Sequence, residues 1–248
     1  MQVIAFHNVK GGVGKTSAAV NIAYLASQEG ISTLLWDLDP QGAATWFLSR
    51  DDHESGKKLG PLIKGKSPIG RFVQQTPYSR LELIPAHQSA RNLDIKLNQL
   101  NSDYPLGNWL SPLSEETALV ILDCPPSLSE LAEQVLKTAN AIYVPIIPTW
   151  LSLNSWQQMN AFTKDLKVKA KRVRPFFSMV DRRKTMHREL VDHRATTLPK
   201  ALTTAIPNAS AIERMGERRK PLELVDRRSV AARAYRDLWS EIRARLKL

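Results

Sequence analysis

The feature that most constrains this chain is its first loop, residues 8–17, which read NVKGGVGKTS. The loop follows a short apolar run and precedes a helical pattern, so it joins a strand to a helix. Its glycines lack a Cβ atom, so their backbone N–H groups can turn inward around phosphate oxygens. We expect the Lys15 ammonium to contact the β- and γ-phosphates of a nucleotide, and the Thr16 hydroxyl to contact Mg²⁺.

A second lysine distinguishes this loop from the commoner phosphate-binding pattern. That pattern has a glycine five positions before the final Gly-Lys-Thr, with four residues between, and here Val9 occupies the position. Lys10 follows it, ahead of Gly11 and Gly12. The loop therefore carries one more cation than a single phosphate-binding lysine would supply.

Strand-like and helical segments alternate along the chain. Near-continuous apolar runs suit strands that are buried on both faces, and helices between them favour a parallel sheet. We therefore expect one α/β domain over residues 1–248, a mostly parallel twisted sheet flanked by helices on both faces. Expected strands lie at 3–9, 32–39, 81–86, 118–123, 141–147, 175–180 and 202–207, and helices at 15–29, 127–138 and 151–167, with a polar surface loop over 50–70 followed by a short helix.

Carboxylates stand at the ends of two expected strands. Asp37 and Asp39 end the run at 32–39, and period-two alternation places both on one face. Asp123 ends the run at 118–123. Ligands of open α/β sheets bind at this end, and clustered carboxylates favour a cation such as Mg²⁺. The single cysteine, Cys124, is expected to be a small buried apolar residue.

Three strings together carry a family resemblance: KGGVGKT at 10–16, DLDPQG at 37–42 and DCPP at 123–126. They resemble the boxes of the ParA/MinD family of deviant Walker A ATPases, and the ParA-like branch in particular. Segments 144–156, 178–190 and 205–215 are also similar, although Asn208–Ala209 stands where the family often has Arg-Asn.

The resemblance implies an ATPase whose site residues can be named. Lys10 would reach the nucleotide of a partner subunit in an ATP-dependent homodimer, Lys15 would bind phosphate, and Asp39 would orient or activate the attacking water. The Mg²⁺ shell would involve Thr16, Asp37, Asp39 and Asp123. Nucleotide contacts would come from Lys10, Gly11, Gly12, Val13, Gly14, Lys15, Thr16, Ser17, Asp181 and Pro207.

Positive charge is concentrated in the last third of the chain. The net charge is +11, yet residues 164–248 carry 23 Lys+Arg against 10 Asp+Glu, and residues 1–163 carry 12 against 14. Such an excess indicates either a solvated basic surface or a surface that binds a polyanion. The resemblance implies nonspecific binding of double-stranded DNA, with candidate contacts at Arg218, Arg219, Lys220, Arg227, Arg228, Lys169, Lys171 and Arg172.

The resemblance also implies a cargo-bound, ParB-like or adaptor partner that stimulates hydrolysis, and a cytoplasmic, nucleoid-associated protein. The alternative is a membrane-associated positioning ATPase of the MinD type, because the tail at 229–248 is a basic amphipathic helix. Its mixed polar face favours docking on the domain instead. Metabolic amidoligases share the phosphate loop, and we expect this chain to be too short for their second domain.

Overall fold

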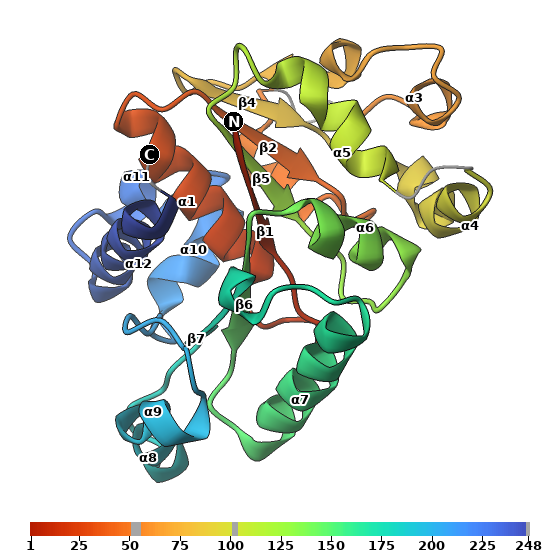
Figure 1. Cartoon of the computed structure of the whole chain (residues 1–248). Helices are drawn as coiled ribbons and strands as arrows, with labels where there is room; N and C mark the ends of the chain where they lie inside the picture. The colour runs from red at the N-terminus through yellow and green to blue at the C-terminus, as the bar shows by residue number, and fades with distance from the viewer. Residues whose placement is uncertain (51–55, 101–103, 247–248) are drawn as a thin grey trace.

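A seven-stranded sheet forms the centre of the molecule (Figure 1). The computed structural model describes residues 1–50, 56–100 and 104–246. The strand order is β3-β4-β2-β5-β1-β6-β7, and every neighbouring pair is parallel except β3 and β4. The strands are β1 (Gln2–Phe6), β2 (Thr33–Asp37), β3 (Gln74–Gln75), β4 (Leu81–Ile84), β5 (Leu119–Asp123), β6 (Ala141–Ile146) and β7 (Val173–Phe177). The predicted single α/β fold is confirmed.

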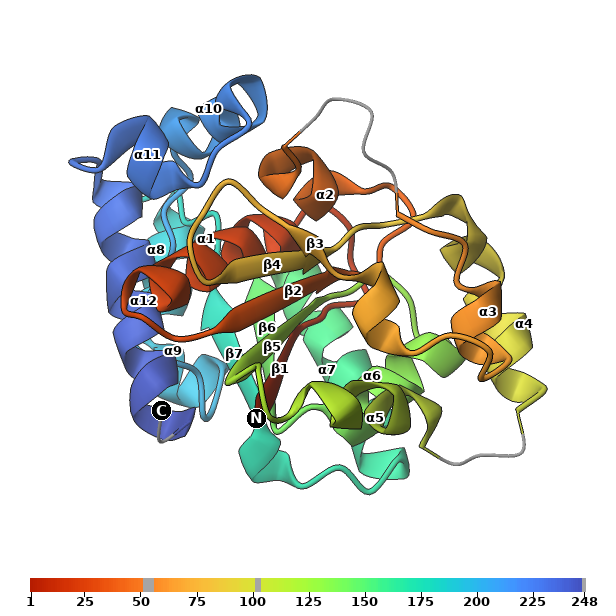
Figure 2. The same ribbon diagram turned by 90° about the horizontal axis from the view of Figure 1, so that it is seen from above.

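Two hydrophobic clusters cover the two faces of the sheet, because side chains alternate along each strand. Val3 and Ala5 of β1 belong to one cluster, whereas Ile4 and Phe6 belong to the other. The first cluster contains residues of α4 (Leu93–Asn98), α5 (Pro105–Leu110), α6 (Glu130–Thr138) and α7 (Trp150–Asp165). The second contains residues of α1 (Lys15–Gln28), α2 (Ala43–Leu48), α10 (Ser210–Arg218), α11 (Leu222–Asp226) and α12 (Val230–Leu246). Figure 2 shows these two helical layers on either side of the strands.

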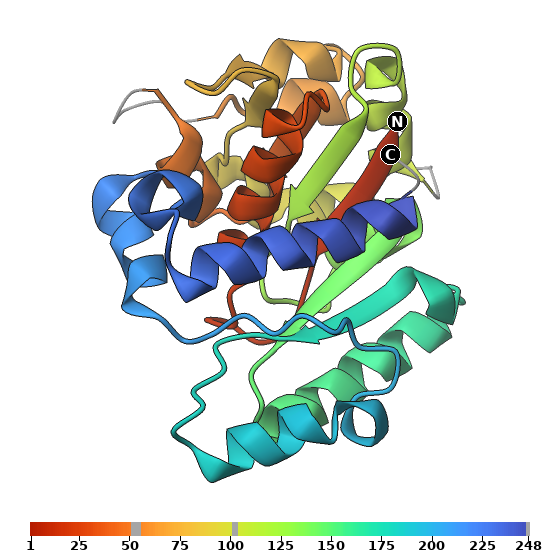
Figure 3. The ribbon, with the colours of Figure 1, turned by 90° about the vertical axis from the view of Figure 1, so that its left-hand side faces the viewer.

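The C-terminal helix α12 packs along the layer that contains α1 (Figure 3). Its apolar stripe is buried, including Leu238 at 0% and Trp239 at 2% exposure. Burial of this stripe is the main stabilising force for a helix of mixed polarity. The expectation that the tail docks on the domain is confirmed.

Two expected segments differ from the observed ones. Residues 202–207 form no strand; the segment has an isolated bridge between Val180 and Pro207, and its Leu202 and Ile206 N–H groups donate to carbonyl oxygens of β7. Glu241 of α12 fixes this segment by accepting hydrogen bonds from the backbone N–H groups of Thr203 and Thr204. In the polar region 50–70, residues 51–55 lie outside the described residues, and α3 (Gly60–Ile63) lies inside the region predicted to be loop. A 3-10 turn at Ile69–Phe72 stands where a short helix was predicted to follow that loop. The remaining described helices are α8 (Thr185–Asp192) and α9 (Arg194–Thr197).

Strand register brings the acidic strand ends together beside the first loop. Asp37 at the end of β2 is paired in register with Asp123 at the end of β5. Asp123 is in turn paired with Phe6, the last residue of β1. The carboxyl ends of the three central strands therefore meet where the chain leaves β1 for the glycine-rich loop, which is the usual ligand edge of an open α/β sheet.

Candidate functional site

The glycine-rich loop has a backbone that other residues could not easily adopt. Gly12 and Gly14 have φ angles of 69° and 92°, in the left-handed region. A Cβ atom added to Gly14 would lie 2.9 Å from Ser178 Oγ, so both conformation and space require glycine there. Among the described residues no side chain caps α1, so its first N–H groups remain available to an anion.

Asn8 holds the entrance of the loop in place. Its side-chain amide donates to the Pro145 carbonyl at 2.7 Å, and its Oδ1 accepts from the Lys10 backbone N–H at 3.0 Å. The residue is buried, so these bonds are made away from water. The loop is thereby fixed to β6 as well as to β1.

Lys15 is a buried cation that lies against the loop itself. Its Nζ donates to the Lys10 carbonyl oxygen at 3.1 Å, and only 7% of the residue is exposed. Burial lowers the pKa of Lys15, and the negative charge of Asp123 partly offsets this effect. A buried ammonium with a single described acceptor is well suited to receive phosphate oxygens.

A pocket of about 330 Å³ lies over this loop. Its walls contain the predicted loop residues other than Lys10, with Asp39, on one side, and Pro207 with α10 residues on the other. The lining residues are Gly11, Gly12, Val13, Gly14, Lys15, Thr16, Ser17, Asp39, Pro126, Ser178, Met179, Ile206, Pro207, Asn208, Ala209, Ile212, Glu213 and Tyr235. Asp181 is not among them, and its carboxylate accepts two hydrogen bonds from the Arg183 guanidinium at 2.9 Å.

Asp123 is a fully buried carboxylate whose two oxygens have no hydrogen-bond partner among the described residues. Burial, and secondly the charge of Asp37, raise the pKa of Asp123 well above its usual range, and the nearby Thr16 hydroxyl and the Lys15 charge oppose that rise. A buried carboxylate without a partner is costly, and a divalent cation would remove that cost. Together with the Thr16 hydroxyl, this oxygen pair fits Mg²⁺ held through water, because Mg²⁺ commonly keeps several waters beside one or two carboxylates.

Asp37 differs from Asp123 because both of its oxygens are already engaged. One oxygen accepts from the Thr45 backbone N–H at 2.8 Å and from the Thr45 hydroxyl at 2.7 Å. The other accepts from the Asp39 backbone N–H at 3.2 Å. Burial raises the pKa of Asp37 to about 6, and the Thr45 hydrogen bonds oppose that rise. Asp37 therefore fixes the Asp39 turn and the start of α2.

The predicted DNA-contacting residues fall into two separate groups. Arg218 ends α10, Arg219 and Lys220 follow it, and Arg227 and Arg228 follow α11, which contacts both α10 and α12. Lys169, Lys171 and Arg172 instead precede β7, at the amino edge of the sheet and away from the loop. Because the parallel strands share one direction, this second group lies at the opposite ends of the strands from the glycine-rich loop.

Arg172 is engaged within the domain. Its guanidinium donates to the carbonyl oxygens of Leu136, Lys137 and Ala139, at the end of α6. Burial lowers the pKa of Arg172. These contacts satisfy carbonyl groups that the end of a helix leaves without partners. Arg172 therefore caps α6, whereas the sequence predicted an exposed DNA contact.

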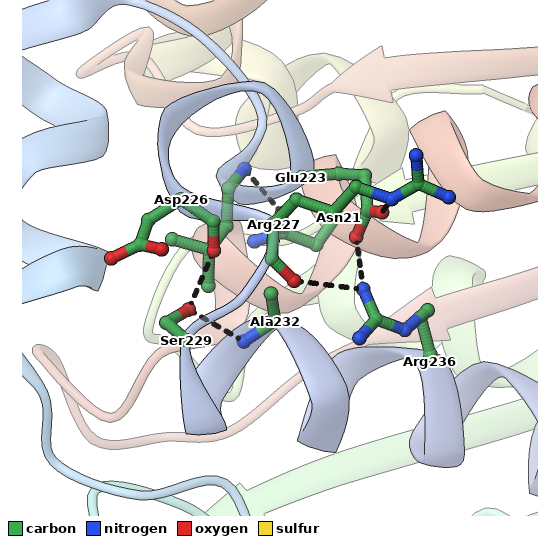
Figure 4. A network of polar contacts seen from close by, with 8 residues as sticks. Asn21, Glu223, Asp226, Arg227, Ser229, Ala232 and Arg236 are labelled. Carbon is green, nitrogen blue, oxygen red and sulfur yellow. Dashed lines mark hydrogen bonds and ion pairs between the residues drawn. The ribbon is translucent and has the colours of Figure 1, made fainter.

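Four arginines lie at the junction of α11 and α12, and Figure 4 shows two of them, Arg227 and Arg236, around Glu223. Glu223 accepts an ion pair from Arg227 at 2.9 Å and from Arg236 at 2.7 Å. Arg228 and Arg233 are exposed and have no ion pair among the described residues. These four arginines line one shallow hollow of about 690 Å³.

Residues that the sequence patterns did not identify as functional also meet at the site. Tyr235 of α12 lines the pocket, although its position in the apolar stripe indicated only packing. Asn21 of α1 donates to Met215 of α10 and accepts from the Leu222 backbone N–H at 2.8 Å. A polar residue on a buried helix face was the only sign in the sequence that Asn21 has specific partners. Those partners lie far away in the chain, so residue spacing could not identify them.

Comparison with known proteins agrees with this geometry. The family model described as AAA domain matches residues 1–174. "Chromosome partitioning protein ParA" of Myxococcus xanthus is 28% identical over 255 residues, covering 98% of this chain and 88% of that protein. "Chromosome-partitioning ATPase Soj" of Treponema pallidum is 28% identical over 250 residues, covering 98% of each chain.

Solved structures resemble the fold over nearly the whole chain. Apo McdA of Cyanothece has a TM-score of 0.84 at 20% identity, with 98% of this chain and 99% of that chain covered. Cobyrinic acid a,c-diamide synthase of Mycobacterium smegmatis, with bound ATP analogue and magnesium, has a TM-score of 0.82 at 26% identity, with 98% and 94% covered. The family match, the full-length relatives and the phosphate-loop geometry together show that this chain belongs to the AAA domain family and, within it, to the ParA/MinD group of P-loop ATPases.

Proposed function

We propose that this chain is a ParA-like ATPase that binds Mg²⁺ and ATP, dimerises, and binds DNA nonspecifically in the ATP-bound state. The observation that carries the proposal is the meeting of Lys15, Thr16 and Asp39 in one pocket, with the unpartnered Asp123 carboxylate behind it. The solved Mycobacterium smegmatis relative, which holds an ATP analogue and magnesium, supports the choice of ligand.

Hydrolysis at this site would depend on positioning and charge. Lys15 would leave the Lys10 carbonyl for the phosphates, where Mg²⁺ supplies further neutralisation of negative charge. Asp39 lines the pocket, and its turn is fixed by Asp37 through the 3.2 Å hydrogen bond. A fixed carboxylate facing the pocket is placed to orient the attacking water.

Lys10 and its surroundings support a dimer interface at the mouth of the pocket. The Lys10 Nζ donates to the Ser152 hydroxyl at 3.3 Å, a single neutral partner that a phosphate could replace. Next to Ser152, Trp150 and Leu151 at the start of α7 are 68% and 66% exposed. A second copy would cover this apolar surface, which water otherwise contacts at some cost.

The arginine hollow at α11 and α12 supports a DNA surface. Glu223 neutralises part of the charge of Arg227 and Arg236 and holds them beside Arg228 and Arg233. We propose that Arg228 and Arg233 make the principal phosphate contacts, together with the α10 residues Arg218 and Lys220. Such contacts are additive and salt-dependent, and a dimer doubles them.

The membrane-binding alternative is less well supported. No helix among the described residues combines the length and apolarity needed to cross a bilayer. The apolar stripe of α12, which would have to enter a lipid surface, is buried against the domain. A membrane role would require that stripe to detach from the domain, which would lose the free energy gained by burying its apolar surface.

The length-based exclusion of amidoligases is wrong. This chain covers 94% of the solved diamide synthase of Mycobacterium smegmatis, so no second domain is needed to match that protein. The basic excess of residues 164–248 supports the DNA-binding function over the amidoligase function, because phosphoryl chemistry alone does not require it. We propose a cargo-bound protein as the partner that stimulates hydrolysis, and place the protein in the cytoplasm on the nucleoid.

The decisive experiment measures binding to nonspecific duplex DNA with ATP, with ADP and without nucleotide, over a series of salt concentrations. We expect the wild-type protein to retain DNA only with ATP. Lys10→Ala should lose both dimerisation and DNA retention. In Arg228→Gln/Arg233→Gln, the slope of log affinity against log salt concentration should fall by about two in magnitude. The matched control is Lys169→Gln/Lys171→Gln, which removes equal charge at the far edge of the sheet.

Anionic liposomes provide the competing surface in the same experiment. DNA binding that ignores nucleotide, together with liposome binding that requires ATP, would overturn the proposal in favour of the membrane function. An equal loss of DNA affinity in the control variant would overturn the placement of the DNA surface at α11 and α12.

A further inference from the structure

The two walls of the nucleotide pocket are joined outside it by one pair of side chains. One wall holds Asp39, which leads through Gly42 into α2, and the other holds Ile212 and Glu213 of α10. The Arg219 guanidinium at the end of α10 lies over the Trp46 ring of α2, 4.1 Å from its centroid.

Two hydrogen bonds accompany this stacking. Arg219 Nε donates to the Trp46 carbonyl oxygen at 3.1 Å, and Trp46 Nε1 donates to the Gly216 carbonyl oxygen at 3.2 Å. Trp46 remains 48% exposed, so burial alone does not explain the large aromatic ring at this position. Arg219 itself adopts a left-handed φ of 50°, which directs the chain back after α10.

The path from this pair to the reacting end of the pocket is short and rigid. The Thr45 backbone and hydroxyl, next to Trp46, bind Asp37, which also holds the Asp39 backbone N–H. On the other side, Met215 of α10 is fully buried and accepts from Asn21 of the phosphate-loop helix. A change in the distance between α2 and α10 would therefore move both walls of the pocket.

We propose that Trp46 and Arg219 are positioning residues that hold these walls together and slow the release of bound nucleotide. This inference rests on the proposed function, since it assumes that the pocket takes a nucleotide. It also assigns Arg219 to this contact in place of the DNA surface. The pair acts through α2 and α10, because neither residue lines the pocket.

The test measures the dissociation rate of N-methylanthraniloyl-ADP from the full-length protein, chased with excess ADP in Mg²⁺. ADP is used so that release is independent of the proposed ATP-dependent dimer. Loss of an exposed cation–π contact and one or two hydrogen bonds should accelerate release about threefold to tenfold in Trp46→Leu and in Arg219→Gln. The double variant should release no faster than either single variant.

Two further variants separate positioning from a general structural effect. Trp46→Phe keeps an aromatic face for Arg219 and should restore most of the slow release. Arg214→Gln removes the same charge from α10, where the described partners of Arg214 are Ser210 and Asp226 in place of any α2 residue, so its release rate should match the wild type.

Unchanged rates in the single variants, or effects that multiply in the double variant, would overturn the positioning role and leave the proposed function intact. Failure of the wild-type protein to hold the labelled ADP would overturn the proposed function, and the positioning role with it.

Discussion

The buried His7 ring should make the nucleotide-free protein sensitive to acid. His7 follows β1 directly, is completely buried, and neither of its ring nitrogens has a partner among the described residues. Burial, and secondly the charge of Lys15, lower the pKa of His7 from 6.5 to about 3. Between these values only the unfolded chain binds the proton, so stability present above pH 6.5 is lost as the pH falls toward 3.

The expected magnitude follows from that window. At pH 5.0 the unfolded histidine lies 1.5 units below its ordinary pKa, and at 1.36 kcal/mol per unit the free energy of unfolding falls by about 2 kcal/mol. The assay is urea unfolding followed by circular dichroism at pH 7.5 and pH 5.0, for wild type and His7→Leu. Other groups titrate in both proteins, so the difference between their losses isolates His7.

His193→Gln, which removes an exposed histidine, serves as the control variant in this measurement. We expect His7→Leu to lose about 2 kcal/mol less than the wild type between the two pH values. Equal losses in wild type and His7→Leu would refute the reasoning, because the ring would then be able to bind its proton in the folded state.

Three further changes test other parts of the structure by urea unfolding. Thr45→Val removes a hydroxyl that donates to Asp37 and accepts from the Ala86 backbone N–H, and should cost about 2–4 kcal/mol; a loss under about 1 kcal/mol would contradict this account. Arg172→Gln should cost about 1–3 kcal/mol while DNA affinity stays unchanged, and lower affinity at unchanged stability would restore Arg172 to the DNA surface. Leu238→Ala should cost about 2–5 kcal/mol, and little or no cost would show that α12 detaches easily, as membrane binding requires.

The phosphate loop and the strand ends could be predicted because their signals are local. Three glycines, Lys15 and Thr16 lie within six residues, and the φ angles of Gly12 and Gly14 are the ones that glycine permits. Asp37 and Asp123 each end an apolar strand, and the parallel register then places them side by side. The tail helix could be predicted in the same way, from apolar residues three and four positions apart.

Contacts between distant segments required the tertiary structure. Arg219 and Trp46 are 173 positions apart, so no spacing rule connects them. The charges of Arg172 and Arg228 look alike in the sequence, yet one caps α6 and the other is exposed in the arginine hollow. Likewise, the backbone N–H groups of Thr203 and Thr204, in the strand expected at 202–207, donate to Glu241, and the pattern of apolar residues does not record these contacts.

The sequence by itself thus determined the glycine-rich loop and the acidic strand ends, because loop conformation and strand ends depend mainly on residues that are adjacent in the chain. The tertiary structure alone decided which arginines share a surface and which polar groups are already satisfied. Those properties depend on what each side chain meets after the helices pack on the sheet, as the engaged Asp37 and the unpartnered Asp123 illustrate.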